Sequence, residues 1–286
     1  MTIKVVTWNI QWCRGVDGVV DPRRIVEQAR AFADFDVLCL QEVARNYPLL
    51  EGSDAADQFG ALAALLPGYT AIEGVAVDDF SSVDGRREFG NMVLTRVPVI
   101  QVFRHLLPWP ADPTLPTMQR MALEVVLATG LGPLRVTTTH LEFYSATQRE
   151  AQVERLREVQ SEAAGHGVDV WQEPKKGGPF ELRARGPSGI LTGDFNYEVT
   201  DPVHRQMQRP LAGGVARYVD AWTIANPGVA HDPTVGVYDK VQWRGREFCC
   251  DFIFVTEDIA PRVRRLEVNL ESAASDHQPV LLELAA

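Results

Sequence analysis

The segment Ser275-Asp276-His277-Gln278-Pro279-Val280 near the C-terminus, together with Gly193-Asp194-Phe195-Asn196 upstream of it, decides the fold of this chain. Each segment places carboxylate, imidazole or amide side chains beside a hydrophobic, strand-like run, and side chains at strand ends can converge on one cleft. Three shorter segments precede them: Thr7-Trp8-Asn9, Gln41-Glu42 and Thr139-His140-Leu141. Each segment alone is a weak signal, but chance produces the ordered set very rarely. Together they predict the active site of an enzyme.

The charge balance counts against a protein whose whole surface binds nucleic acid. The 286 residues include 28 Lys and Arg against 38 Asp and Glu, a formal net charge of −10, whereas a non-specific nucleic-acid binder usually has a basic footprint. An acidic enzyme can still bind a phosphate if a divalent cation supplies the local positive charge. Hydrophobic residues make up 45% of the chain, and no run approaches the roughly 20 apolar residues of a spanning helix. We expect a globular protein without a membrane-spanning segment.

The four cysteines favour a reducing compartment over a secreted disulfide protein. Their spacing matches no zinc-ligand pattern, and the neighbours Cys249 and Cys250 cannot easily bridge each other. No signal-peptide pattern precedes the first predicted strand. We therefore expect reduced thiols, a cytoplasmic location and a monomer.

Strand-like and helix-like segments mingle without a domain-sized linker, so we expect one domain over residues 1–286. The predicted strands are residues 3–10, 37–41, 69–77, 91–95, 121–127, 134–139, 189–191, 251–256, 264–270 and 280–284. The predicted helices are residues 22–35, 56–66, 145–164 and 202–209. The third helix is the clearest, because its apolar residues recur at three- and four-residue spacing opposite charged ones.

The polar residues at the strand ends are suited to phosphoester cleavage. Cleavage needs positive charge on the phosphate oxygens, an oriented water with a base, and help for the leaving oxygen. Glu42 is the first choice as a ligand for Mg²⁺ or Mn²⁺, because these cations prefer oxygen. Asp194 can orient or deprotonate a water, and the Asn196 amide can donate to a phosphate oxygen. Alone, Glu42 would more often be a solvated glutamate at a strand end, and Asp194 with Asn196 would more often form an ordinary Asx turn.

The second group of candidates contains two histidines. Asp276 offers a carboxylate on the metal side and His277 an imidazole for the phosphate, for which an acidic partner such as Asp251 would keep the ring charged. His140 ends another predicted strand, although a single histidine there is more often structural. Asn9 lies between apolar neighbours, consistent with a strand end that supports a metal-binding carboxylate.

In this order the motifs resemble the endonuclease/exonuclease/phosphatase superfamily over residues 3–284. The resemblance implies a four-layer α/β sandwich, with two packed mixed β-sheets flanked by helices and a cleft at one edge. It also implies that Glu42 binds the cation with Asn9 and Asp276 close to it, and that Asp194 prepares the water. The residues implied to contact the phosphate are His140, Asn196 and His277, the last paired with Asp251. Some members pair the middle histidine with an upstream glutamate, for which Glu88, just before Gly90-Asn91, is the candidate.

Two segments could set the substrate. Residues 104–119 form a proline-rich loop, and residues 165–189 contain Trp171, Lys175, Lys176, Phe180, Arg183 and Arg185. Basic residues interleaved with aromatic ones could bind a nucleic-acid backbone and stack on bases, although a solvated surface hairpin is the plainer interpretation.

The leading hypothesis is a nuclease that hydrolyses phosphodiesters with Mg²⁺ or Mn²⁺. A phosphomonoesterase or a phospholipase C/sphingomyelinase-like hydrolase is the alternative, which the acidic charge favours. A catalytically inert binding protein on the same fold is the non-enzymatic alternative, and the presence of all the motif residues counts against it.

Overall fold

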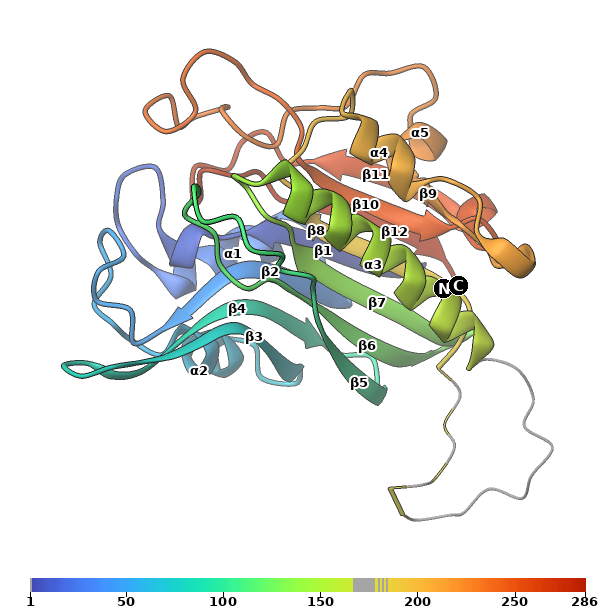
Figure 1. The fold of residues 1–286 in the computed structure, drawn as a ribbon, viewed down its shortest axis with the longest axis horizontal. Coiled ribbons are helices and arrows are strands. Elements are labelled where there is room, and N and C mark those ends of the chain that lie inside the picture. Colours follow the sequence, from blue (N-terminus) through green and yellow to red (C-terminus); the bar gives the residue numbers. More distant parts are fainter. Residues whose placement is uncertain (1, 167–177, 180, 182, 184) are drawn as a thin grey trace.

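Two six-stranded β-sheets pack face to face with helices on their outer faces, as the computed structural model shows for residues 2–166, 178–179, 181, 183 and 185–286 (Figure 1). The predicted four-layer α/β sandwich is confirmed.

The first sheet has the strand order β11-β12-β1-β2-β4-β3. Strands β1 and β2 are parallel, and every other neighbouring pair is antiparallel. The strands of this sheet are β1 Thr2–Asn9, β2 Val37–Arg45, β3 Thr70–Ser81, β4 Gly85–Thr95, β11 Val263–Val268 and β12 Val280–Ala285.

The second sheet has the order β5-β6-β7-β8-β10-β9, and here β7 and β8 form the parallel pair. Its strands are β5 Val99–Leu106, β6 Met121–Thr129, β7 Gly132–His140, β8 Gly189–Asp194, β9 Tyr218–Asp220 and β10 Asp251–Thr256. Each sheet therefore has a parallel pair near its middle, flanked by antiparallel strands.

The helices begin at capping residues that the sequence supplies. Asp21 accepts a hydrogen bond from the amide of Arg23 at the start of α1, whose first residue is Pro22, and Ser145 caps α3 through the amide of Gln148. The helices are α1 Pro22–Phe32, α2 Gln58–Leu65, α3 Ala146–Gly165, α4 Pro202–Met207 and α5 Ala221–Ala225, and the short 3₁₀ turns are Gln11–Cys13, Ala212–Gly214 and Ala260–Arg262.

The strands are apolar on both faces because both faces are covered. Along β1, Val5 points into the core between the sheets, whereas Val6 and Trp8 point to the core under α1 and α2. A third core lies under α3 and α4, where Leu156 packs with Phe252. Alternation of side chains along a buried strand thus fills two separate layers at once.

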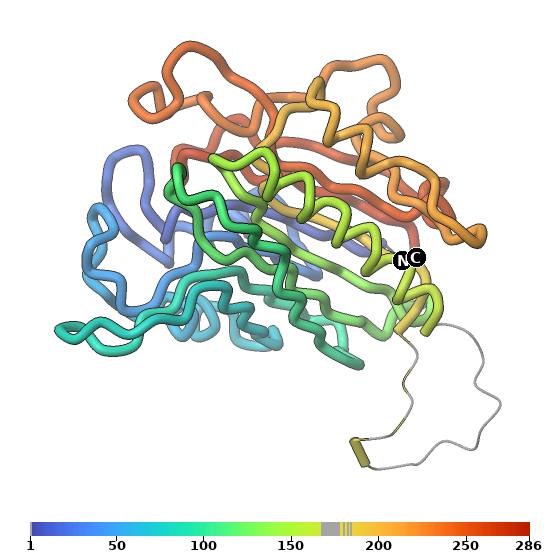
Figure 2. Tube along the Cα trace, in the orientation of Figure 1, coloured from blue at the N-terminus to red at the C-terminus, as the bar shows by residue number. Residues whose placement is uncertain are grey.

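The strand directions bring the ends of the central strands of both sheets to the same end of the molecule. The parallel strands β1 and β2 end there, as do β7 and β8, and the antiparallel strands β10 and β12 begin there. The two chain ends lie together at the opposite end, where Thr2 pairs with Ala285 (Figures 1 and 2). The polar strand-end residues are therefore collected at the edge remote from the chain ends.

The structure also departs from the predicted elements. Strands β5 and β9 and helix α5 were not predicted, and β5 takes up the first residues of the 104–119 segment predicted as a loop. Strand β2 does not end before Glu42 but continues to Arg45. A bulge interrupts its pairing with β4 between Leu40 and Val43, and the pairing resumes after it. No helix in the described part of the chain is long and apolar enough to cross a membrane.

Candidate active site

Asn9, the last residue of β1, holds two carboxylates together. Its Nδ2 donates to Glu42 Oε1 at 3.0 Å and to Asp194 Oδ2 at 3.0 Å, while its Oδ1 accepts the amide of Gln11 at 3.1 Å. The amide nitrogen therefore faces the carboxylates and the oxygen faces the backbone. In this orientation the side chain positions the two carboxylates, and the role of Asn9 as a metal ligand stays a prediction.

Glu42 lies at the bulge of β2 and has a positive φ of 62°. A bulge redirects one side chain out of the regular alternation, and a non-glycine residue with this backbone conformation is common at functional sites. Burial, followed by the neighbouring charge of Asp276, raises the pKa of Glu42 to about 7. The carboxylates of Glu42 and Asp276, which can each offer oxygen atoms to a metal ion, thus share a poorly solvated site.

Asp194 and Asn196 form a tight turn after β8. The amide of Asn196 donates to Asp194 Oδ1 at 2.9 Å, and Asn196 Nδ2 donates to the Leu141 carbonyl at 2.9 Å. Gly193 permits this turn, because a Cβ there would lie 1.9 Å from the carbonyl oxygen of Thr139 on β7. Burial and the charge of Asp251 raise the pKa of Asp194 to about 6. A carboxylate that titrates near neutral pH is suited to accepting a proton.

His277 is paired with Asp251, as the resemblance implies. Its Nδ1 lies 2.8 Å from Asp251 Oδ2, and its Nε2 lies 3.7 Å from Asp194 Oδ2. Burial alone would lower the pKa of His277, but the carboxylates of Asp251, Asp276 and Asp194 outweigh it and raise the pKa well above its ordinary value. The ring is therefore an imidazolium, with Nε2 directed towards the other site residues.

The pKa of His140, at the end of β7, is shifted in the direction opposite to that of His277. Its Nε2 lies 3.5 Å from Asp194 Oδ2 and 3.9 Å from Glu42 Oε1. Burial, and then the positive charges of Arg120 and His277, lower its pKa well below the ordinary value. His140 is thus a neutral ring that can donate or accept one hydrogen bond at Nε2.

Glu88 does not pair with His140, and this prediction is wrong. Glu88 lies directly opposite Arg45 in the register of β2 and β4, and its carboxylate binds Arg45 and Arg86. Asn91 lies nearer to the site: its Nδ2 donates to the Met121 carbonyl at 3.2 Å, and it lines a small cavity together with His140. Asn91 is not among the residues that line the cleft.

Two side chains that were not predicted from the sequence border the cleft. Arg120 is only 6% exposed; its Nε lies 3.3 Å from Glu142 Oε2, and its Nη1 is buried without a hydrogen-bond partner in the described structure. Trp243 donates its indole N–H to Asp276 Oδ2 at 3.0 Å. Trp243 lies in a loop without a periodic pattern. Arg120 directly precedes β6, a strand-end position that the sequence reasoning did not use.

These side chains line a cleft of about 190 Å³. The residues around it are Glu42, Met118, Arg120, His140, Phe143, Tyr144, Asp194, Asn196, Gln242, Trp243, Asp276 and His277. Glu42 and Asp276 supply hard oxygen atoms in a buried place where negative charge is in excess, so the residues present fit a divalent cation. Cys250, Asp251 and His277 also lie within 4.8 Å of one another, but Asp251 Oδ2 is already bound to His277. The oxygen-rich side of the cleft is the better fit for Mg²⁺ or Mn²⁺.

The described basic residues of the 165–189 segment, Arg183 and Arg185, do not line the cleft. Its flanking elements meet at the start of β8, whereas Asp194 ends that strand, so the segment is attached at the opposite end of the sandwich. Arg185 is buried, with Nε 2.8 Å from Glu124 Oε1, and Arg183 donates to the Ile100 carbonyl. The remaining residues of that prediction, Trp171, Lys175, Lys176 and Phe180, lie outside the described residues.

A model of the Endonuclease/Exonuclease/phosphatase family matches residues 6–277. The chain belongs to this family. Members of the family hydrolyse phosphoesters and generally depend on a divalent metal, so the prediction of a phosphoester-hydrolysing enzyme is confirmed at that level. No curated protein sequence matches the chain.

Solved structures of the family share the fold. The endonuclease/exonuclease/phosphatase from Beutenbergia cavernae DSM 12333 is 26% identical, with a TM-score of 0.69 over 99% of this chain and 71% of the other. A mannosyl-6-phosphatase from Bacteroides thetaiotaomicron VPI-5482 is 18% identical, with a TM-score of 0.67 over 99% of this chain and 100% of the other. D. rerio TDP2 complexed with a single-strand DNA product is also 18% identical, with a TM-score of 0.63 over 100% of this chain and 99% of the other. The last two similarities concern the fold alone.

Proposed function

We propose that the protein is a Mg²⁺- or Mn²⁺-dependent phosphoester hydrolase in which Asp194 activates the attacking water. The observation that carries this proposal is the position of Asp194. It shares one cleft with the oxygen ligands Glu42 and Asp276 and with the cations Arg120 and His277. A base, a metal site and phosphate-binding charges are the parts that phosphoester hydrolysis requires.

The residues divide into an acidic and a cationic set around the phosphate. Glu42 and Asp276 would hold the cation, which when bound would neutralise charge on the phosphate oxygens. Asn9 keeps the Glu42 and Asp194 carboxylates in place, so that Asp194 Oδ2 is presented to a water. The His277 imidazolium, oriented by Asp251, donates to a phosphate oxygen and supports the developing negative charge.

The neutral donors complete the proposed phosphate site. His140 Nε2 and the amide of Asn196 can each donate to a phosphate oxygen without adding charge. Arg120 supplies a guanidinium that was not predicted from the sequence, and its unpartnered Nη1 is available to an anion.

We predict a nucleic acid as the substrate, and therefore nuclease activity. The similarity to TDP2, which was crystallised with a single-strand DNA product, supports this prediction. Phosphomonoester hydrolysis is the second candidate. The absence of a basic surface from the described surroundings of the cleft favours it, and so does the similarity to a mannosyl-6-phosphatase. One domain, a monomeric state and a cytoplasmic location are further parts of the proposal; the four buried, unbonded cysteines support a reducing compartment.

The test is metal-dependent hydrolysis of p-nitrophenyl phosphate and bis-p-nitrophenyl phosphate, with plasmid DNA and single-stranded RNA alongside. We expect activity with Mg²⁺ or Mn²⁺ that EDTA removes. Asp194→Asn should reduce kcat by roughly 10²–10⁴-fold, the contribution of a general base. Asp258→Asn, at the far end of β10, is the matched control. Full activity of Asp194→Asn would overturn the proposed base.

A further inference from the structure

A second cavity adjoins the catalytic cleft, and the proposed chemistry does not use it. It has a volume of about 310 Å³ and shares Asn196, Phe143 and Trp243 with the cleft. A phosphate held beside Asn196 would therefore have its organic substituent directed into this space. Cavities of about 300 Å³ and above are of the size that accommodates small organic ligands.

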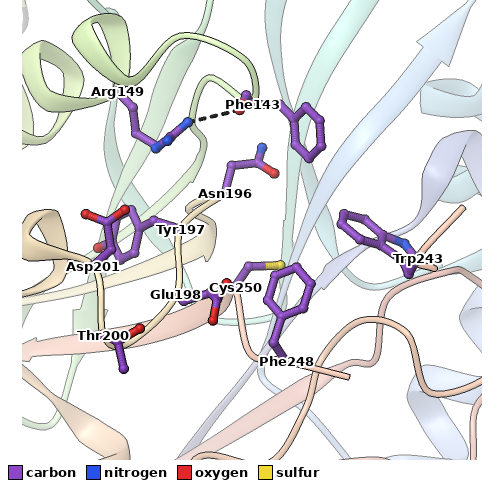
Figure 3. A pocket seen from close by; sticks show the side chains of 10 residues that line it. All are labelled: Phe143, Arg149, Asn196, Tyr197, Glu198, Thr200, Asp201, Trp243, Phe248 and Cys250. Atoms are coloured by element: carbon purple, nitrogen blue, oxygen red, sulfur yellow. Dashed lines mark hydrogen bonds between the residues drawn. The ribbon is translucent and has the colours of Figure 1, made fainter. Parts of the chain in front are cut away.

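The two walls of the cavity differ in character. The aromatic rings of Phe143, Trp243 and Phe248 lie on one side, and the side chains of Arg149, Thr200 and Asp201 lie on the other (Figure 3). A ligand that fits both walls needs an apolar face and a hydrogen-bonding edge.

The aromatic rings of the wall contact one another and neighbouring side chains. The ring centroids of Phe143 and Trp243 are 6.1 Å apart and those of Trp243 and Phe248 are 5.6 Å apart, both in edge-to-face geometry. The Trp243 indole is held by its hydrogen bond to Asp276, and Arg246 lies over the Phe248 ring at 5.2 Å. A wall that is already ordered costs little conformational entropy on binding.

The polar wall offers hydrogen-bonding groups to the hydroxyl groups of a ligand. Asp201 uses Oδ1 to accept the amide of Val203 at the start of α4, and its second oxygen remains an acceptor. Glu198 is bound to Arg246. Arg149, which also lines the cavity, donates through Nη1 to the carbonyls of Glu142 and Phe143 at 2.7 and 3.0 Å, and its Nε has no partner in the described structure. The wall thus offers the free carboxylate oxygen of Asp201 and the hydroxyl group of Thr200, which are suited to the hydroxyl groups of a ligand.

We propose that this cavity binds the uncharged, hydroxyl-rich ring of a sugar or cyclic polyol phosphate, whose ester phosphate lies in the catalytic cleft. The ring presents an apolar face to the aromatic wall and its hydroxyl groups to Thr200 and Asp201. This assignment of the substrate class rests on the proposed phosphoester hydrolase activity.

The experiment compares kcat/KM for hexose 6-phosphates and inositol monophosphates with kcat/KM for p-nitrophenyl phosphate, whose ring cannot donate hydrogen bonds. In Thr200→Val, the ratio of the two values should fall by roughly three- to tenfold for the loss of one hydrogen bond. In Asp201→Asn it should fall by roughly tenfold or more, because a charged acceptor is lost. Thr70→Val, exposed at the start of β3 near the opposite edge, should leave the ratio unchanged.

The possible results separate this proposal from the proposed function. Hydrolysis of p-nitrophenyl phosphate with no change of the ratio in either variant would overturn the ring-binding assignment alone. The same ratio can be measured with a dinucleotide in place of the sugar phosphate. If the two variants lower kcat/KM relative to p-nitrophenyl phosphate for the dinucleotide but not for the sugar phosphates, the cavity binds a nucleobase and the ring-binding assignment is overturned. Calorimetry of Asp194→Asn with the preferred sugar phosphate provides a readout without turnover: we expect binding that Thr200→Val weakens, and absence of binding would overturn the assignment.

Discussion

Arg120→Met tests the cation that was not predicted from the sequence. The Arg120 guanidinium is buried at the cleft, with Nε towards Glu142 and Nη1 unpartnered. A hydrogen bond to a charged group contributes about 1.5–3 kcal/mol. Because about 1.4 kcal/mol corresponds to a tenfold rate change, kcat/KM should fall roughly 10- to 150-fold. Methionine preserves most of the side-chain volume, so the loss would report on charge and hydrogen bonding.

The same change also removes the partner of Glu142, and breaking a buried ion pair costs about 3–5 kcal/mol of folding free energy. The double variant Arg120→Met/Glu142→Gln removes that unpaired charge. The amide oxygen of the introduced glutamine can still accept the Tyr144 amide, which Glu142 Oε1 accepts at 2.9 Å. We expect the double variant to recover the melting temperature but not the activity.

Steady-state kinetics on p-nitrophenyl phosphate and its bis ester, with urea denaturation of each variant, measure the two effects separately. Arg264→Met, at an exposed position of β11, is the control and should match the unsubstituted protein in both. If the double variant is stable and keeps its full kcat/KM, Arg120 does not bind the phosphate and the reasoning from its unpartnered Nη1 is wrong.

Three further predictions concern the metal, pH and stability. Glu42→Gln should move the midpoint of Mg²⁺ activation to higher concentration by roughly tenfold or more, because even outer-shell changes weaken metal binding 10- to 100-fold; an unmoved titration would remove Glu42 from the metal site. In the metal-free protein the pKa values of Glu42 and Asp194 are raised to about 7 and about 6, so both groups bind protons more tightly when folded than when unfolded. The stability that these two groups contribute is therefore lost as the pH rises from about 4 to 7, whereas the lowered pKa of His140 acts in the opposite direction. Mg²⁺ should raise the melting temperature more at about pH 8 than at about pH 5; equal increments at both pH values would contradict this. Glu124→Gln leaves the buried Arg135 and Arg185 without their carboxylate and should cost about 3–5 kcal/mol in denaturant unfolding with kcat retained; a loss of kcat in the folded variant would place this cluster in the catalytic machinery.

The sequence was informative about the site at several strand ends where a polar side chain adjoins an apolar strand, although it missed Arg120 before β6. Asp194, Asp251 and His277 are such residues, and strand direction alone brings them to one edge. The same reasoning could not orient a side chain. It placed Asn9 in the site but could not show which end of its amide faces the carboxylates, since that depends on the Gln11 amide.

Register and loop contacts were the parts that could not be predicted. Glu88 was assigned to a histidine from the family resemblance, because it lies just before Gly90-Asn91, whereas the pairing of β2 with β4 sets it opposite Arg45. Trp243 reaches Asp276 from a loop without periodic pattern, and Arg185 is drawn into the core by a glutamate on a distant strand. Each of these depends on contacts between segments far apart in the chain.

The pairing of Thr2 with Ala285 has a consequence for chain connectivity. A short peptide could join the two ends, and the chain could be reopened between α3 and β8 without changing the strand order of either sheet. In such a circular permutant the Asp194 turn and His277 would precede Asn9, Glu42 and His140, although every side chain would keep its neighbours in the cleft. The linear order of the motifs, by which this kind of chain is recognised, is thus separable from the geometry that would carry out the reaction.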